Sequence, residues 1–133
     1  MTDCADSPCR LLVVEDSEDL ALVWKILFQE AGYEARFCAT GQAAMALADA
    51  GYAPDVLITD YYLPDRTGLE VIHHIRARDP QVHVLMVTGH SDDGFLQRLD
   101  SEGVEVLCKP VRFDDLRARI AAMRQRRAEG TGP

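Results

Sequence analysis

Short apolar runs alternate along the chain with longer segments in which apolar residues recur every three or four positions. Most of the runs are rich in Val, Ile and Leu and are too short for helices, which is typical of strands buried in a parallel sheet. These runs are residues 11–14, 34–37, 56–59, 82–87 and 104–107. The helical pattern covers residues 17–31, 40–50, 67–79, 91–99 and 113–123. We therefore predict five strands, each followed by a helix.

Capping residues stand at several ends of the predicted helices. Ser17 and Asp19 offer a side-chain cap and negative charge at the start of the first helix. Gly32 is placed to end that helix in a left-handed conformation. The segment Thr67-Gly68-Leu69-Glu70 matches a capping box, and Pro80 stops the helix that follows it.

Strands that alternate with helices predict an α/β fold, a doubly wound parallel sheet with helices on both faces. The pattern leaves two strand orders open, the dinucleotide-binding order and the flavodoxin-like order. The turn after the first strand reads Glu15-Asp16-Ser17 and lacks the glycine-rich fingerprint of dinucleotide binding. A glycine-rich phosphate loop ending in Lys-Ser or Lys-Thr is also absent from the sequence.

Length and composition describe one folded domain with a negative charge. The chain has 133 residues, of which 47% are hydrophobic and 27% charged, and its formal net charge is −8. Such a charge disfavours direct nucleic-acid binding, and we interpret the arginines near the C-terminus as a solvated helix face. No apolar run is long enough to cross a membrane, and residues 1–8 do not resemble a signal peptide. We therefore expect a cytoplasmic protein.

Other residues with potential chemistry receive structural interpretations. The cysteines form no C-x-x-C pair, and Cys38 and Cys108 have apolar neighbours, so we predict both in the core. His73 and His74 lack the spacing of metal ligands and are placed on a polar helix flank. Trp24 belongs to the apolar stripe of the first helix.

Polar residues stand directly after four of the predicted strands: Glu15-Asp16 after the first, Asp60 after the third, Thr88 after the fourth and Lys109 after the fifth. In a doubly wound sheet these strand ends share one edge, where ligands bind. Three carboxylates at that edge would repel one another without a cation between them. Because oxygen ligands suit Mg²⁺, we predict a magnesium site there.

This set of groups suits phosphoryl transfer. A carboxylate such as that of Asp60 is able to attack phosphorus, and Lys109 would pair with Asp60 at rest or with a bound phosphoryl group. The Thr88 hydroxyl would hydrogen-bond a phosphoryl oxygen. Simple helix capping would account for Asp16 alone, but it does not account for the whole set.

In order and spacing, these residues resemble the receiver domain of two-component response regulators, such as the chemotaxis regulators. The matching positions are Glu15-Asp16, Asp60, Pro64, Gly68, Thr88 and Lys109-Pro110. The resemblance extends from about Leu11 to Met123 and implies the flavodoxin-like strand order 2-1-3-4-5. It also implies a receiver domain over residues 10–126, an extension over residues 1–9 and a tail over residues 127–133.

The resemblance assigns roles to individual residues. Asp60 would be the phospho-acceptor, and Asp16 and Asp60 would bind Mg²⁺ with help from Glu15 and the backbone carbonyl of Tyr62. Thr88 and Lys109 would contact the phosphoryl group. The implied donor is a sensor histidine kinase or a histidine phosphotransfer protein, and the domain would catalyse its own phosphorylation and slow dephosphorylation without being a turnover enzyme.

Two departures from the family pattern affect these expectations. The family has an aromatic switch residue three positions before the lysine, where this chain has Val106, in a segment one residue shorter than usual. We therefore expect signalling through the loop after Thr88 and the predicted 91–99 helix. Bulky Tyr62 and His90, two residues after Asp60 and Thr88, are expected to shield the phosphoryl group from water.

Several alternatives stay open from the sequence. One is an interaction domain on the same scaffold that acts without phosphate, and another is a Mg²⁺-dependent hydrolase with an aspartyl nucleophile. Related phosphatases carry a second Asp two residues after the first, where this chain has Tyr62. No output domain fits after Met123, so we expect a stand-alone regulator or a fragment of a larger protein. A homodimer through the last two helices and the last strand is also open.

Overall fold

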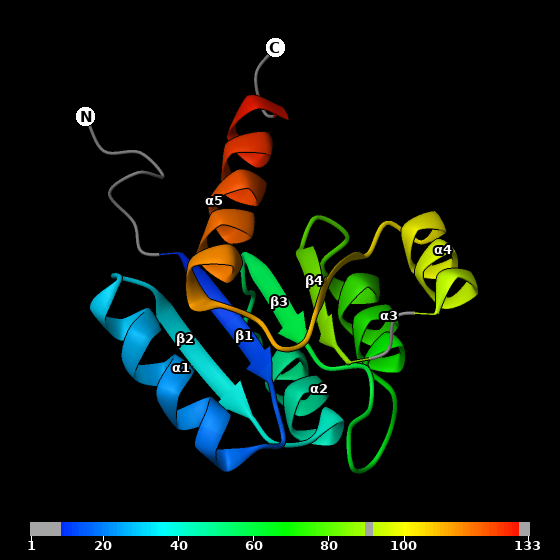
Figure 1. Cartoon of the computed structure of the whole chain (residues 1–133), viewed down its shortest axis with the longest axis horizontal. Coiled ribbons are helices and arrows are strands. Elements are labelled where there is room, and N and C mark those ends of the chain that lie inside the picture. The colour runs from blue at the N-terminus through cyan, green and yellow to red at the C-terminus, as the bar shows by residue number, and fades with distance from the viewer. Residues whose placement is uncertain (1–8, 90–91, 131–133) are drawn as a thin grey trace.

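The computed structural model describes residues 9–89 and 92–130, and the side chains within them except those of residues 127–130. Strands and helices alternate along the chain in the predicted order (Figure 1). The strands are β1 Arg10–Val14, β2 Glu34–Cys38, β3 Val56–Thr59, β4 His83–Thr88 and β5 Glu105–Cys108. The helices are α1 Glu18–Glu30, α2 Gly41–Asp49, α3 Gly68–Arg78, α4 Asp93–Ser101 and α5 Phe113–Gly130.

All strand pairs in the sheet are parallel, and the strand order is β2-β1-β3-β4-β5. The flavodoxin-like order is thereby confirmed. The chain reverses its direction of winding between β1 and β3, so the carboxyl ends of these two strands border the crevice where such sheets bind ligands. Val14 of β1 pairs with Thr59 of β3, which brings the residues after both strands to the same level.

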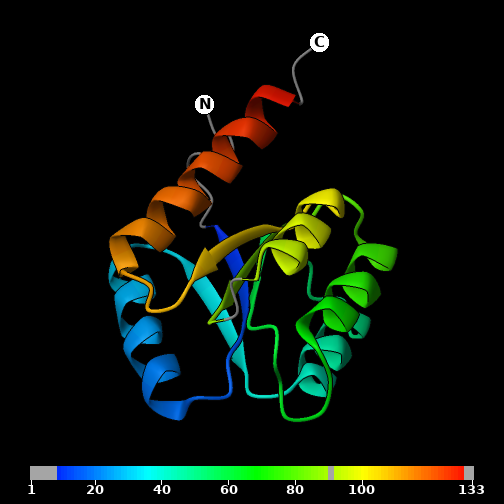
Figure 2. The ribbon, with the colours of Figure 1, turned by 45° about the vertical axis from the view of Figure 1, so that its right-hand side comes forward.

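Helices cover both faces of the sheet, and each face has its own core (Figure 2). On one face α1 and α5 pack through Trp24, Phe28, Leu116, Ile120 and Met123. On the other face α2, α3 and α4 pack through a second set of buried residues, which includes Ala44, Ala48, Leu69, Ile72, Ile75 and Leu99. The central strands are buried on both sides, which explains why β1, β3 and β4 read as continuous apolar runs.

The predicted capping residues lie at the ends of the helices, as expected. Ser17 caps α1 by accepting a hydrogen bond from the Leu20 amide, and Thr67 and Glu70 form both bonds of a capping box on α3. Gly32 has a φ of 89°, a left-handed conformation that favours glycine. These local signals were read correctly because each depends on residues three or four positions apart.

Two expectations need correction. Cys108 was predicted in the core but is exposed, because it is the last residue of the edge strand β5. Cys9, to which no role was assigned, is buried instead. The fourth helix was predicted from residue 91, but α4 begins at Asp93 with Asp92 as its cap. His90, Ser91 and the tail 131–133 lie outside the described residues.

α5 continues to Gly130 and projects past the end of the sheet in Figures 1 and 2. Among the residues of α5 whose burial the structure describes, Met123 is the last buried apolar one. Within the part of the chain that the structure describes, no helix has the length and apolar character needed to cross a membrane.

Candidate functional site

Three carboxylates meet at the carboxyl edge of the sheet. Glu15 and Asp16 directly follow β1, and Asp60 directly follows β3. The Asp60 amide donates to the Val14 carbonyl at 3.2 Å, which extends the pairing of the two strands to the acidic residues. One carboxylate oxygen from each of the three side chains lies within 4.8 Å of the other two. This spacing places three hard oxygen ligands around one point, as a divalent cation requires.

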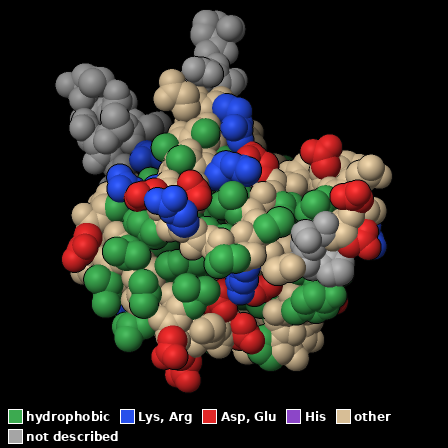
Figure 3. Space-filling view, in the orientation of Figure 1, with side chains coloured by type: hydrophobic (Ala, Val, Ile, Leu, Met, Phe, Trp, Pro, Cys, Tyr) green, Lys and Arg blue, Asp and Glu red, His purple; other side chains and the backbone are tan. Residues whose placement is uncertain are grey.

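Lys109 brings a positive charge to the same place. It follows β5, which is separated from β3 by β4, and its Nζ lies 2.6 Å from Asp60 Oδ2. The same Nζ lies 3.5 Å from Glu15 Oε1. The Lys109 amide donates to the Thr88 carbonyl at 2.8 Å, which fixes the backbone from which the side chain extends. Figure 3 shows acidic side chains gathered around a basic one over this edge of the sheet.

Burial sets the electrostatics of this cluster. The Glu15 side chain is only 2% exposed, and this desolvation raises the pKa of its carboxyl above 4.5. A hydrogen bond from the Ser17 amide at 2.9 Å and the charge of Lys109 oppose that rise without cancelling it. Burial works to lower the pKa of Lys109, but its hydrogen bond to Asp60 and the charge of Glu15 outweigh burial and raise that pKa. Lys109 is therefore a cation at neutral pH, and burial disfavours the charged form of Glu15.

Thr88 ends β4, between the strands that precede Asp60 and Lys109. It is fully buried, so its hydroxyl has no access to solvent in this conformation. The structure therefore places Thr88 at the predicted edge, and the contact of its hydroxyl with a phosphoryl oxygen stays a prediction.

The loop from Asp60 to Gly68 is tightly closed. The Gly68 amide donates to the Tyr61 carbonyl at 2.6 Å, and a β-bridge joins Tyr62 to Thr67. A Cβ atom on Gly68 would lie 2.1 Å from the Asp60 carbonyl oxygen, so only glycine fits at this position. Gly68 thus sets the path of the backbone next to Asp60.

Two aromatic residues, Tyr61 and Tyr62, directly follow Asp60. The Tyr62 side chain is 63% exposed and packs edge-to-face on Tyr61 at 4.8 Å. Tyr61 makes a second edge-to-face contact at 4.8 Å with Phe95 of α4, which connects the loop after Asp60 to that helix. Sequence reasoning missed this contact, because the two rings are far apart in the chain. Shielding by Tyr62 and His90 stays a prediction, and His90 lies outside the described residues.

Val106 of β5 is the residue that the family resemblance assigns to the aromatic switch position. It pairs with Met86 of β4 and is half-buried on the side of the sheet that α4 covers. Together with Leu96 and Asp100 of α4 it lines a groove of ≈ 390 Å³. A valine has no ring that is able to turn between two positions, so a switch of that kind is excluded at this residue.

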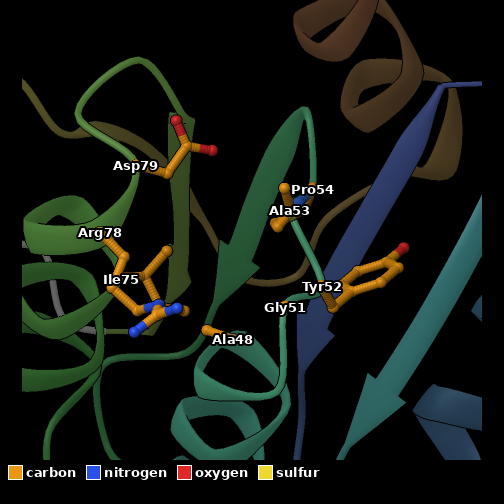
Figure 4. A pocket seen from close by; sticks show the side chains of 8 residues that line it. All are labelled: Ala48, Gly51, Tyr52, Ala53, Pro54, Ile75, Arg78 and Asp79. Atoms are coloured by element: carbon orange, nitrogen blue, oxygen red, sulfur yellow. The ribbon is translucent and has the colours of Figure 1, made fainter.

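The remaining candidates lie away from this edge. His73 and His74 are on α3, where they contact Glu102 at 2.7 Å and Asp49 at 2.9 Å. A pocket of ≈ 130 Å³ lies between the C-terminal ends of α2 and α3, at the opposite end of the sheet (Figure 4). Its lining includes Tyr52, whose hydroxyl donates to the Leu11 carbonyl at 3.1 Å. None of these features adds a group to the acidic cluster.

Comparison with known proteins gives a consistent result. Residues 11–121 match the family described as "response regulator receiver domain". The transcriptional regulatory protein TrcR of Mycobacterium tuberculosis is 32% identical over 90% of this chain and 47% of its own length. The response regulator receiver protein Anae109_2439 of Anaeromyxobacter is 35% identical over 77% of this chain and 43% of its own. The chain thus spans about half the length of such relatives.

Solved structures show the same fold. The chemotaxis response regulator CheY4 of Vibrio cholerae is 27% identical, with a TM-score of 0.80 over 88% of this chain and 99% of that chain. A response regulator receiver domain protein from Clostridium thermocellum is 26% identical, with a TM-score of 0.82 over 90% of this chain and 97% of that chain.

Proposed function

This chain belongs to the response regulator receiver domain family, and we propose that it accepts a phosphoryl group on Asp60 in a Mg²⁺-dependent reaction. The observation that carries the proposal is the meeting of Glu15, Asp16, Asp60 and Lys109 at one edge of the sheet. Response regulators receive phosphate from histidine kinases or phosphotransfer proteins, so the proposed donor is a phosphohistidine on such a partner.

The acidic cluster fits a magnesium ion. Its ligands would be carboxylate oxygens of Asp16 and Asp60 and the backbone carbonyl of Tyr62, with Glu15 assisting. The raised pKa of Glu15 supports this assignment, because a buried carboxylate among like charges is stabilised when a cation binds. When bound, the ion would neutralise charge on the transferring phosphoryl group.

The side chains of this chain supply the rest of the reaction. An oxygen of the Asp60 carboxylate attacks phosphorus, the bond from phosphorus to the donor imidazole nitrogen breaks, and the imidazole leaves with the electron pair of that bond. Lys109, which lies 2.6 Å from Asp60 Oδ2, would move its hydrogen bond to a phosphoryl oxygen. Thr88 would contact another phosphoryl oxygen after a movement of the loop that follows β4.

A signalling domain is favoured over a hydrolase with turnover. The position two residues after Asp60 holds Tyr62, whose phenol has no carboxylate to activate a leaving group or a water molecule. The proposed product is therefore a stable phosphoprotein that acts through protein contacts. We propose that the contact of Tyr61 with Phe95 carries the change to α4, since Val106 is unable to do so. The α4, β5 and α5 surface stays a proposed homodimer interface.

Incubation with acetyl phosphate and Mg²⁺, followed by intact-mass measurement, tests the proposal. We expect one phosphoryl addition, which requires Mg²⁺ and is lost in Asp60→Asn. Asp100→Asn is the matched control, because Asp100 is exposed on α4 away from the acidic cluster. Continuous release of phosphate would indicate the hydrolase, and no reaction would indicate an interaction domain that acts without phosphate.

A further inference from the structure

The loop that follows Asp60 is fastened to the N-terminal end of α2, a helix that contributes no residue to the acidic cluster. Asp65 Oδ1 accepts a hydrogen bond from the Gly41 amide at 2.9 Å, and Asp65 Oδ2 accepts one from the Gln42 amide at 2.8 Å. The carboxylate therefore caps the first two residues of α2 from a segment more than 20 positions away in the sequence. Figures 1 and 2 both show this loop beside the start of α2.

The helix does not need Asp65 for an ordinary cap. Thr40 already caps α2, because its hydroxyl accepts from the Ala43 amide at 3.1 Å. Burial works to raise the pKa of the Asp65 carboxyl, but the hydrogen bonds from the Gly41 and Gln42 amides outweigh it and lower that pKa. Asp65 is thus ionised at neutral pH and bound to two free amides at the positive end of the helix dipole.

Arg66 strengthens the same attachment. Its guanidinium donates to Gln42 Oε1 at 3.1 Å and lies 3.4 Å from the sulfur of Met45. Its methylene groups lie so close to Gly41 that a Cβ atom at position 41 would be 2.6 Å from Arg66 Cγ. The same Cβ atom would lie 2.9 Å from Val71 Cγ2 of α3. The absence of a side chain at position 41 is therefore what lets the loop reach the helix.

The attached loop is short, and two of the proposed metal ligands lie at its start: the carboxylate of Asp60 and the backbone carbonyl of Tyr62. Its corner is closed by the bond from the Leu63 amide to the Arg66 carbonyl at 3.1 Å and by the bridge between Tyr62 and Thr67. A displacement of Asp65 would therefore shift the Tyr62 backbone carbonyl, since few bonds of the chain are free to absorb it. Sites of this kind tolerate displacements of only about 0.5 Å.

We propose that Asp65 is a positioning residue for the phosphoryl site, which it serves by fixing the acceptor loop against α2. This inference rests on the function proposed above, because it concerns the cation that assists phosphorylation of Asp60. It predicts that loss of the Asp65 carboxylate weakens Mg²⁺ binding although Asp65 touches neither the ion nor the phosphoryl group.

The test compares Asp65→Ala with Thr40→Ala. Both variants remove a side-chain cap from the same end of α2, but only the first releases the loop. Asp65→Ala is expected to raise the Mg²⁺ concentration for half-maximal phosphorylation by acetyl phosphate about tenfold, since loss of a group that orients metal ligands typically costs about 10- to 100-fold in metal affinity. Asp65→Asn, which keeps one acceptor oxygen, should fall between wild type and Asp65→Ala.

Thermal unfolding of each variant separates positioning from stability. We expect Thr40→Ala and Asp65→Ala to lower the unfolding temperature by similar amounts. The Mg²⁺ requirement of Thr40→Ala should nevertheless stay within about twofold of wild type. Gly41→Ala places a methyl group of α2 against the side chain of Arg66 and should push the loop away from the helix. This variant should therefore show the same increase in Mg²⁺ requirement as Asp65→Ala. Equal Mg²⁺ requirements in Asp65→Ala and Thr40→Ala would overturn the inference and leave Asp65 a simple cap. A wild-type protein that takes up no phosphoryl group would instead overturn the proposed function.

Discussion

Replacement of Glu15 by Gln removes one negative charge from the acidic cluster and keeps the shape of the side chain. The Glu15 carboxylate lies within 4.8 Å of an Asp60 oxygen and 3.5 Å from Lys109 Nζ. At an effective dielectric constant of about 20, the repulsion at the first distance is about 3.5 kcal/mol and the attraction at the second about 4.7 kcal/mol. Asp16 is exposed, so solvent reduces its repulsion to about 1 kcal/mol.

These charge interactions nearly cancel, so the burial of the Glu15 carboxylate decides how Glu15→Gln changes the free energy of unfolding. Its hydrogen bond from the Ser17 amide would be kept by the glutamine oxygen, whereas the cost of burying a charge would vanish. We therefore expect Glu15→Gln to raise the free energy of unfolding by about 1 to 2 kcal/mol at pH 7 without Mg²⁺. The pKa of Glu15 is raised in the folded protein above its ordinary value of 4.5, which applies to the unfolded chain. The cost of burying the charge is therefore complete above the folded-state pKa and disappears as the pH falls below 4.5.

Urea unfolding followed by the fluorescence of Trp24, the one tryptophan of the chain, measures this effect. The experiment compares wild type, Glu15→Gln and the control Glu30→Gln, which removes a charge from the exposed last turn of α1. The control should change stability by less than about 0.5 kcal/mol. Mg²⁺ should then stabilise wild type more than Glu15→Gln, because the variant lacks a charge that attracts the ion. A destabilised variant at pH 7, or a difference that does not shrink toward pH 4, would refute the reasoning.

Three further predictions concern the acceptor loop and α4. Gly68→Ala should lower the free energy of unfolding by more than about 2 kcal/mol, since its Cβ would collide with the Asp60 carbonyl; denaturant unfolding measures this, and a neutral effect would contradict the close approach. Tyr62→Ala should shorten the lifetime of the phosphorylated protein several-fold by admitting water, as followed by intact mass; an unaltered rate would remove the shielding argument. Beryllofluoride should change the amide NMR shifts of residues 92–109 in wild type and much less in Phe95→Leu; equal changes in both would exclude the Tyr61 contact as the route to α4.

Much of the fold and of the site is predictable from the sequence, because the patterns that indicate them are local or occur at the same position after successive strands. The alternation of apolar runs with helical stripes predicted each strand and helix that the structure describes. The residues directly after β1, β3 and β5 pointed to the edge where Glu15, Asp16, Asp60 and Lys109 meet. Parallel strands bring their carboxyl ends together whatever the details of packing, so this juxtaposition follows from topology alone.

The features that sequence reasoning missed depend on contacts between distant segments. The bonds from Asp65 to α2 and the packing of Tyr61 on Phe95 each join residues more than 20 positions apart and follow no periodicity. Cys108 was placed in the core because its neighbours are apolar, but only the position of β5 at the edge of the sheet decides its exposure. Such facts require the relative placement of helices and strands.

A crystal structure of the protein with Mg²⁺ and beryllofluoride tests the central claim most directly. We expect the beryllium on a carboxylate oxygen of Asp60, with the ion at about 2.1 Å from oxygens of Asp16 and Asp60. Lys109 Nζ, now 2.6 Å from Asp60 Oδ2, should contact a fluorine of the analogue instead. An analogue bound elsewhere, or a Lys109 side chain turned away from it, would contradict a single shared site for the cation and the phosphoryl group.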